Sequence, residues 1–202
     1  MNFDITNLGN QDKYRLLNGG VTPRPIAWIS TKSKNGVNNL APYSFFTVAS
    51  CTPPVLLYTQ ILPRTGNHKD TYANLLETGE CVVNIVSSDL LETMNVTSTT
   101  LGREQSEFDL AKVEHVASVS VAPLSVADSP VRYECKLRET LSTGDSAGAG
   151  TVVLLDVISV YVRDDLFEEG IIDQTRIDSV GKMGGDGYRI KAKHVELDRP
   201  QT

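Results

Sequence analysis

The sequence contains no apolar stretch that approaches the ~20 residues a transmembrane helix needs. Residues 1–4 also lack the basic start and the apolar run of a signal peptide. We therefore expect a cytoplasmic protein with no membrane partner. The glycosylation triplet that starts at Asn95 is then incidental.

Cysteine and histidine are scarce, with three of each in the chain. Cys51, Cys81 and Cys135 lie far apart in the sequence, so their spacing indicates neither a disulfide framework nor a zinc site. Cys81 and Cys135 occur in strand-like runs and are expected in the core, whereas Cys51 is the thiol to test for reactivity. The histidines have no metal-ligand spacing, and no HExxH motif or nucleophile elbow accompanies them. The sequence therefore predicts no metal site and no catalytic side-chain nucleophile.

Positive charge is also deficient, because the formal net charge is -6. Nucleic acid is not an expected partner, since affinity for a phosphate backbone comes from accumulated lysine and arginine. The deficit is uneven: residues 1–75 have seven basic and three acidic side chains, a net charge of +4, and the remainder has -10. This basic excess suits a small anionic ligand. A chance asymmetry on a solvated surface is the alternative.

What the chain does have is a composition typical of one compact domain, with 40% hydrophobic and 22% charged residues. We treat residues 1–202 as a single domain. Alternating and continuous apolar runs predict strands at residues 21–31, 37–47, 54–60, 80–87, 131–141 and 150–163. Residues 152–157 are apolar on both faces, so a helix or another subunit should cover the face that does not meet the core.

The most unusual segment is residues 21–46, which place prolines and asparagines inside a β-hairpin pattern. Pro23 and Pro25 each remove a backbone donor, so the strand should begin at a sheet edge or a bulge. Residues 38–42, NNLAP, suit a core strand poorly because asparagine and proline are depleted there. We expect an irregular edge whose free backbone groups could hold a ligand. An edge-strand bulge without a ligand is the alternative.

A short helix is predicted within residues 63–79, with Asp70 or Thr71 as its N-cap and Gly79 at its end. Its apolar face should include Ala73, Leu75 and Leu76. Lys69 stands directly before the helix and Thr71 offers a hydroxyl at its start, so this end could bind a phosphate. A capped helix with a solvated lysine is the alternative.

A second helix is expected at residues 87–97, with Met94 facing inward. The polar segments 101–107 and 142–150 are expected loops that could close over a ligand, although the second is more simply a long hairpin turn. The sequence leaves open the roles of Arg103 and His68.

Several motifs follow one another in a fixed order over residues 14–190. PRPIAWIST is followed by a loop with a glycine, then NLAPYSFF and the pair Pro53 and Pro54. The later motifs are HKDT at 68–71, GECVVNIV at 79–86, SPxxxEC at 129–135 and VGKMGGxxY at 180–188. Together they closely resemble the flavin reductase-like, FMN-binding split-barrel family, which includes flavoredoxins. Lys182 stands where that family more usually has arginine.

The resemblance implies a mainly β fold with a few short helices: a six-stranded antiparallel Greek-key split β-barrel that forms a homodimer. It also implies an FMN-binding oxidoreductase whose chemistry occurs at the flavin, so no acid, base or nucleophile need be evident. By position, Lys69, Asp70 and Thr71 match the phosphate site. The isoalloxazine ring would lie along Ser30, Thr31, Asn39, Leu40, Ala41, Pro42 and Ser44, and backbone groups around Leu40 and Ala41, left free by Pro42, could bond its polar edge.

The electron donor implied by the resemblance is NADH, NADPH or a protein. The sequence has no GxGxxG fingerprint, so a nicotinamide would have to stack on the flavin directly. Two alternatives stay open: an electron carrier of the flavoredoxin kind without turnover of its own, and a split-barrel binder of another phosphate-bearing ligand, such as a pyridoxal derivative.

Overall fold

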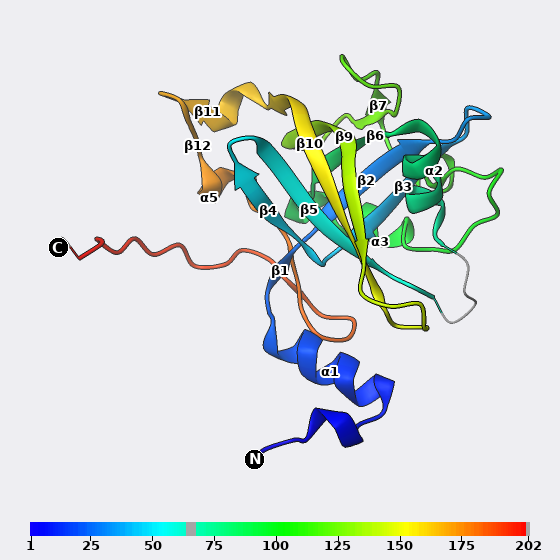
Figure 1. Cartoon of the computed structure of the whole chain (residues 1–202). Coiled ribbons are helices and arrows are strands. Elements are labelled where there is room, and N and C mark those ends of the chain that lie inside the picture. Colours follow the sequence, from blue (N-terminus) through cyan, green and yellow to red (C-terminus); the bar gives the residue numbers. More distant parts are fainter. Residues whose placement is uncertain (64–67, 201–202) are drawn as a thin grey trace.

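The computed structural model describes residues 1–63 and 68–200 (Figure 1). Within these residues the main sheet is antiparallel and has seven strands in the order β3-β2-β6-β9-β10-β5-β4. Its strands are β2 Ala27–Lys32, β3 Asn38–Tyr43, β4 Phe46–Cys51, β5 Pro54–Ile61, β6 Glu80–Ile85, β9 Val131–Ser142 and β10 Gly150–Val162. The expected mainly β fold with short helices is confirmed.

The sheet has one strand more than the six expected, because the predicted strand 37–47 is two strands in the structure. The chain bends at Ser44 and Phe45, so β3 pairs with β2 at one edge of the sheet while β4 pairs with β5 at the other. Tyr43 at the end of β3 still meets Tyr58 of β5, with ring centroids 4.8 Å apart. The bend therefore brings the two edges of the curled sheet together. Among the described strands, the hydrogen-bonded ladder stays open between β3 and β4.

The predicted strand 21–31 is also divided. Its first part, β1 Arg24–Pro25, belongs to a separate three-stranded sheet with β13 Gly181–Lys182 and β14 Tyr188–Arg189, and β2 starts only at Ala27. The prolines explain the break, since neither Pro23 nor Pro25 can donate to a ladder. Before them lies a helix that the sequence did not predict, α1 Asn10–Gly20, in which Asn18 is the one buried residue. The large apolar residues of α1 are Tyr14, Leu16 and Leu17, and all three are exposed, so the segment lacked the core-facing periodicity that identifies a helix.

Two cores lie on opposite faces of β2 and β3, because successive side chains of a strand alternate. Ala27 and Ile29 join the cluster that contains Tyr43, Tyr58 and Leu75. The second cluster has the following buried members: Ile26, Trp28, Leu40, Val86, Met94, Phe108, Val113, Val126 and Val180. Residues that alternate along β2 and β3 therefore belong to two different cores on opposite faces.

Three predictions about buried residues are confirmed. Met94 is 1% exposed and belongs to the second core. Cys81 and Cys135 are both fully buried and lie opposite each other on β6 and β9, while Cys51 is exposed. The thiols of Cys81 and Cys135 therefore pack as small apolar side chains.

The other helical segments and short strands precede, link or follow the strands of the main sheet along the chain (Figure 1). The helical segments are η1 Ile5–Asn7, α2 Asp70–Thr78, η2 Ser88–Leu90, α3 Leu91–Val96, α4 Glu107–Leu110, η3 Asp164–Leu166 and α5 Gln174–Ile177. The short strand pairs are β7 His115–Val116 with β8 Ser125–Val126, and β11 Phe167–Glu168 with β12 Ile171–Ile172. The helix predicted at 87–97 is thus divided into η2 and α3, and 142–150 joins β9 to β10 as a hairpin turn. Across the described residues, no helix combines the length and apolarity needed to cross a bilayer.

Candidate functional site

Helix α2 begins without a side-chain cap from the described residues. Lys69 occupies the N-cap position in an extended conformation, so the prediction that Asp70 or Thr71 caps the helix is wrong. Both are instead the first residues of the helix, and Gly79 ends it in the left-handed conformation with φ 73°, as predicted. Leu76 is 55% exposed and was wrongly assigned to the apolar face. The amides of the first turn thus have no side-chain acceptor among residues 1–63 and 68–200.

A buried polar network fastens α2 to β2 and β3. The Asn39 Oδ1 atom accepts hydrogen bonds from Thr71 Oγ1 at 2.7 Å and from Thr31 Oγ1 at 3.2 Å, and Asn74 Nδ2 donates to Thr31 Oγ1 at 3.1 Å. Each of these four residues is at most 7% exposed. The structure therefore brings the predicted residues Thr31, Asn39 and Thr71 together, but their polar groups point at one another. In particular, the Thr71 hydroxyl donates its proton to Asn39 and has none left for a phosphate.

Glu107, the first residue of α4, completes the network. One carboxylate oxygen, Oε2, accepts from the Asn39 side-chain amide and from the Leu40 backbone amide, both at 3.0 Å. The Leu40 amide, expected to be free, is thus occupied. Glu107 is 5% exposed, and burial raises the pKa of its carboxyl. The sequence did not identify Glu107, since a single acidic residue at the end of a polar loop forms no pattern that indicates burial or a contact with β3.

Lys69 and Tyr43 lie together at the start of α2. The Lys69 Nζ atom is 5.3 Å from the centre of the Tyr43 ring. Although Lys69 as a whole is exposed, desolvation of its ammonium end lowers the pKa of the side chain. The Tyr43 hydroxyl lies near Thr71 but has no hydrogen-bond partner within the described residues, and burial raises the pKa of Tyr43 far above its usual value. A buried polar group without a partner is uncommon and fits a place that a ligand completes.

Asp70 faces away from this network, toward the loop 101–107. Its Oδ1 atom is 3.6 Å from Arg103 Nη1, and Arg103 Nη2 is 2.7 Å from Glu77 Oε1. On the other side of the helix start, His68 is exposed, and its Nδ1 atom is 2.9 Å from Gln60 Nε2. Arg64, another basic residue of this segment, lies outside the described residues.

The other predicted residues lie on the opposite face of β2 and β3. Ser30 and Leu40 are fully buried there, and Ser30 Oγ donates to the Leu124 carbonyl at 2.5 Å. Pro42 and Ser44 line a pocket of about 280 Å³ whose other residues are Ile26, Met94, Asn95, Ser98, Lys182, Gly185, Asp186 and Tyr188. Strand alternation thus separates these four residues from Thr31, Asn39 and Ala41, which face α2. The described structure therefore does not bring all ten predicted residues into one pocket.

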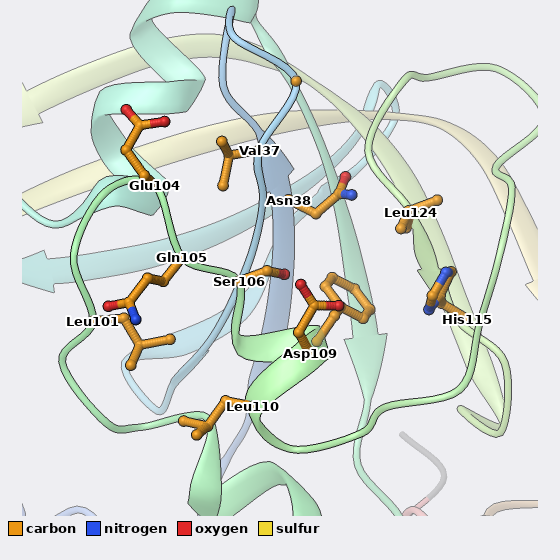
Figure 2. A pocket seen from close by; sticks show the side chains of 12 residues that line it. Val37, Asn38, Leu101, Glu104, Gln105, Ser106, Asp109, Leu110, His115 and Leu124 are labelled. Carbon is orange, nitrogen blue, oxygen red and sulfur yellow. The ribbon is translucent and has the colours of Figure 1, made fainter.

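A pocket of about 730 Å³ lies at the β2–β3 turn and the loop 101–107 (Figure 2). Figure 2 shows Asn38, Ser106 and Asp109 around its middle and His115 and Leu124 to their right. The charged side chains that line it within the described residues are the acids Glu104 and Asp109. It contains none of the ten predicted residues, and its charge does not suit an anion. The start of α2, with Lys69, is therefore the better candidate for an anionic ligand.

Comparison with proteins of known sequence gives close relatives over the whole chain. An uncharacterized protein of Halalkalibacterium halodurans is 38% identical over 202 residues, which cover 99% of this chain and 97% of the relative.

Solved structures match at similar coverage. Nitrilotriacetate monooxygenase component B from Bacillus cereus has a TM-score of 0.92 at 29% identity, covering 98% of each chain. The 2-nitrobenzoate 2-nitroreductase of Pseudomonas fluorescens has a TM-score of 0.89 at 27% identity, covering 99% of this chain and 96% of the other. A structure from Shewanella frigidimarina that is described by a split barrel domain has a TM-score of 0.85 at 24% identity, covering 99% and 100%, and shows the fold alone.

The family model described as "Flavin reductase like domain" matches residues 19–181. This match takes in β2, β3 and α2, the elements that form the candidate site. The chain therefore belongs to the flavin reductase-like family.

Proposed function

We propose that this protein binds FMN at the start of α2 and passes electrons through it as a flavin reductase-like oxidoreductase. The observation that carries the proposal is the position of Lys69 near the Tyr43 ring at the start of α2. Among the described residues, the buried Tyr43 hydroxyl has no hydrogen-bond partner and no side chain caps this helix start. A helix N-terminus with a lysine provides both hydrogen bonds and positive charge for a phosphate. Because the chain belongs to the flavin reductase-like family, we propose that this phosphate is part of a flavin nucleotide.

The residues present fit the phosphate of FMN in a specific way. Lys69 would supply the charge, and the backbone amides of Asp70 and Thr71 would supply hydrogen bonds. The Thr71 hydroxyl would act indirectly, since its bond to Asn39 holds the helix start against β3. We retain as proposed neighbours of the ring Ser30 and Thr31 of β2, Asn39, Leu40, Ala41 and Pro42 of β3, and Ser44 in the bend after β3. The flavin supplies the hydride and electron chemistry, and the protein orients it.

The proposed reaction is reduction of FMN by NADH or NADPH, followed by electron transfer to an acceptor. The structural relatives support a reductase, because one is named a component of a monooxygenase and the other a nitroreductase. A nicotinamide would bind against the flavin, since the sequence has no dinucleotide-binding glycine motif. The cytoplasm is the proposed location.

A homodimer is part of the proposal. The outer end of β10 exposes Ile158, Val160 and Tyr161 by 44%, 50% and 42%. Apolar side chains gathered on one strand are a typical surface for a second copy of the chain. Sedimentation or light scattering would test it, and a monomer at micromolar concentration would contradict it.

The absorbance spectrum of the purified protein tests FMN binding directly. We expect flavin bands, or saturable binding when FMN is titrated into colourless protein. Oxidation of NADH or NADPH with FMN as acceptor, and with 2-nitrobenzoate as a second probe, then tests turnover. FMN binding without any nicotinamide oxidation would favour the electron carrier, and a protein that binds no flavin would contradict the proposal.

A further inference from the structure

We infer that Arg103 sets the affinity of the α2 site for the phosphate of FMN by neutralising Asp70, without touching the ligand. The inference rests on the proposed function, and it concerns a residue outside the predicted FMN site. Arg103 comes from the loop 101–107 and reaches across to α2.

Asp70 is at a place where its charge has two opposite effects. A carboxylate in the first turn stabilises the helix through the macrodipole. The same carboxylate follows Lys69 directly and would repel a phosphate bound at that helix start. Asp70 is 33% exposed in its side chain, so water screens the repulsion only in part. A cation close to Asp70 can therefore keep the stabilising charge and reduce the repulsion.

Arg103 is held in the position that this role needs. Its Nη2 atom is 2.7 Å from Glu77 and its Nη1 atom is 3.6 Å from Asp70. Asp70 and Glu77 are seven residues apart, which places them two turns apart on the same face of α2. Glu77 thus anchors the guanidinium, and the weaker contact with Asp70 supplies the charge compensation.

The charges on and beside α2 explain why Arg103 would affect the binding of an anionic ligand. Lys69, Asp70, Glu77 and Arg103 sum to zero, whereas without Arg103 the same group is negative. Glu77 lies about 10 Å along the helix from Asp70, close to the screening length of physiological salt. Of the two carboxylates that Arg103 contacts, Asp70 is therefore the one that acts on the helix start. Both Nη atoms of Arg103 are directed to carboxylates, which makes Arg103 a positioning residue.

The experiment compares FMN with riboflavin, which lacks the phosphate, by fluorescence titration of five proteins. These are the wild type, Arg103→Gln, Arg103→Lys, the double variant Asp70→Asn/Arg103→Gln, and the control Arg138→Gln. Arg138 pairs with Asp156 at 2.7 Å and has 41% side-chain exposure, against 42% for Arg103, but lies on β9. Circular dichroism checks that each variant is folded, and Arg103→Lys tests whether charge alone restores binding.

We expect Arg103→Gln to weaken FMN binding about fivefold, the size of effect that a partly screened charge can have. Riboflavin binding should not change, and the loss for FMN should shrink at about 0.5 M salt. The double variant and Arg103→Lys should bind FMN within about twofold of the wild type, and Arg138→Gln should match it.

Three results would overturn the inference while leaving the proposed function intact. They are equal FMN affinity of wild type and Arg103→Gln, equal losses for FMN and riboflavin, and a loss that persists in the double variant, which would mean that Arg103 contacts the phosphate itself. A wild type that binds no FMN would contradict the proposed function and this inference together.

Discussion

The carboxylate of Glu107 lies 3.0 Å from the side-chain amide of Asn39 and determines which way that amide faces. Because Asn39 Nδ2 donates to Glu107, Oδ1 is directed at the hydroxyls of Thr31 and Thr71. Asn39 of the edge strand β3 thus joins the start of α4, through Glu107, to the start of α2, through Thr71. This places Glu107 at the centre of the frame that supports the candidate site.

Removing the Glu107 carboxylate should destabilise the protein. Glu107→Ala leaves the Asn39 amide and the Leu40 backbone amide buried without an acceptor, and we expect a loss of about 2–4 kcal/mol in the free energy of unfolding. Glu107→Gln keeps one carbonyl acceptor and should lose about half as much. Urea unfolding measures both variants. Glu104→Gln, an exposed neighbour, is the control, and equal stability of all three variants would show that the network contributes nothing.

The same carboxyl predicts a pH dependence with a definite sign. Burial raises the pKa of Glu107 from its ordinary value of 4.5, so the folded state binds a proton more readily than the unfolded state. Its contribution to stability is therefore greatest below pH 4.5 and decreases as pH rises through the raised pKa. The unfolding free energy of the wild type minus that of Glu107→Gln should therefore decrease as the pH rises from 4.5 through the raised pKa. A flat difference, or one of opposite slope, would contradict the prediction.

Loss of the ammonium group at position 69 should weaken FMN binding. Lys69→Ala removes a charge-assisted contact, which we expect to cost ~1.5–3 kcal/mol of binding free energy. Isothermal titration with FMN measures it. His194→Gln changes an exposed residue far along the chain and serves as the control. If the two variants bind FMN equally well, Lys69 is not part of the site.

Tyr43→Phe tests whether the Tyr43 hydroxyl binds the ligand or stabilises the fold. In the flavin-free protein the hydroxyl has no partner among the described residues, so its removal should leave the free energy of unfolding unchanged or raise it by up to ~1 kcal/mol. In FMN titrations the variant should bind about tenfold more weakly, since a hydrogen bond is lost. Thermal melts and fluorescence titration give the two values. A variant that is less stable without flavin yet binds FMN normally would assign the hydroxyl to the fold.

Local patterns in the sequence determined much of the scaffold. The apolar runs of β5, β6, β9 and β10 predicted four long strands close to their observed bounds, because strand periodicity is visible in a single segment. Gly79 marked the end of α2 for a similar local reason, as only a residue tolerant of positive φ fits there. The ordered motifs placed the chain in its family, and they indicated where Lys69 and β3 would matter.

Tertiary structure decided what those residues do. The bend at Ser44 and Phe45 depends on β5 as a pairing partner, and α1 has no buried apolar face from which to be predicted. Glu107 reaches Asn39 across 68 positions of sequence, and Asn74 reaches Thr31 across 43. Such contacts leave no local periodicity, since each depends on where two distant segments are packed. For this reason the sequence identified Thr71 as a candidate ligand, while the packing turned its hydroxyl inward to Asn39.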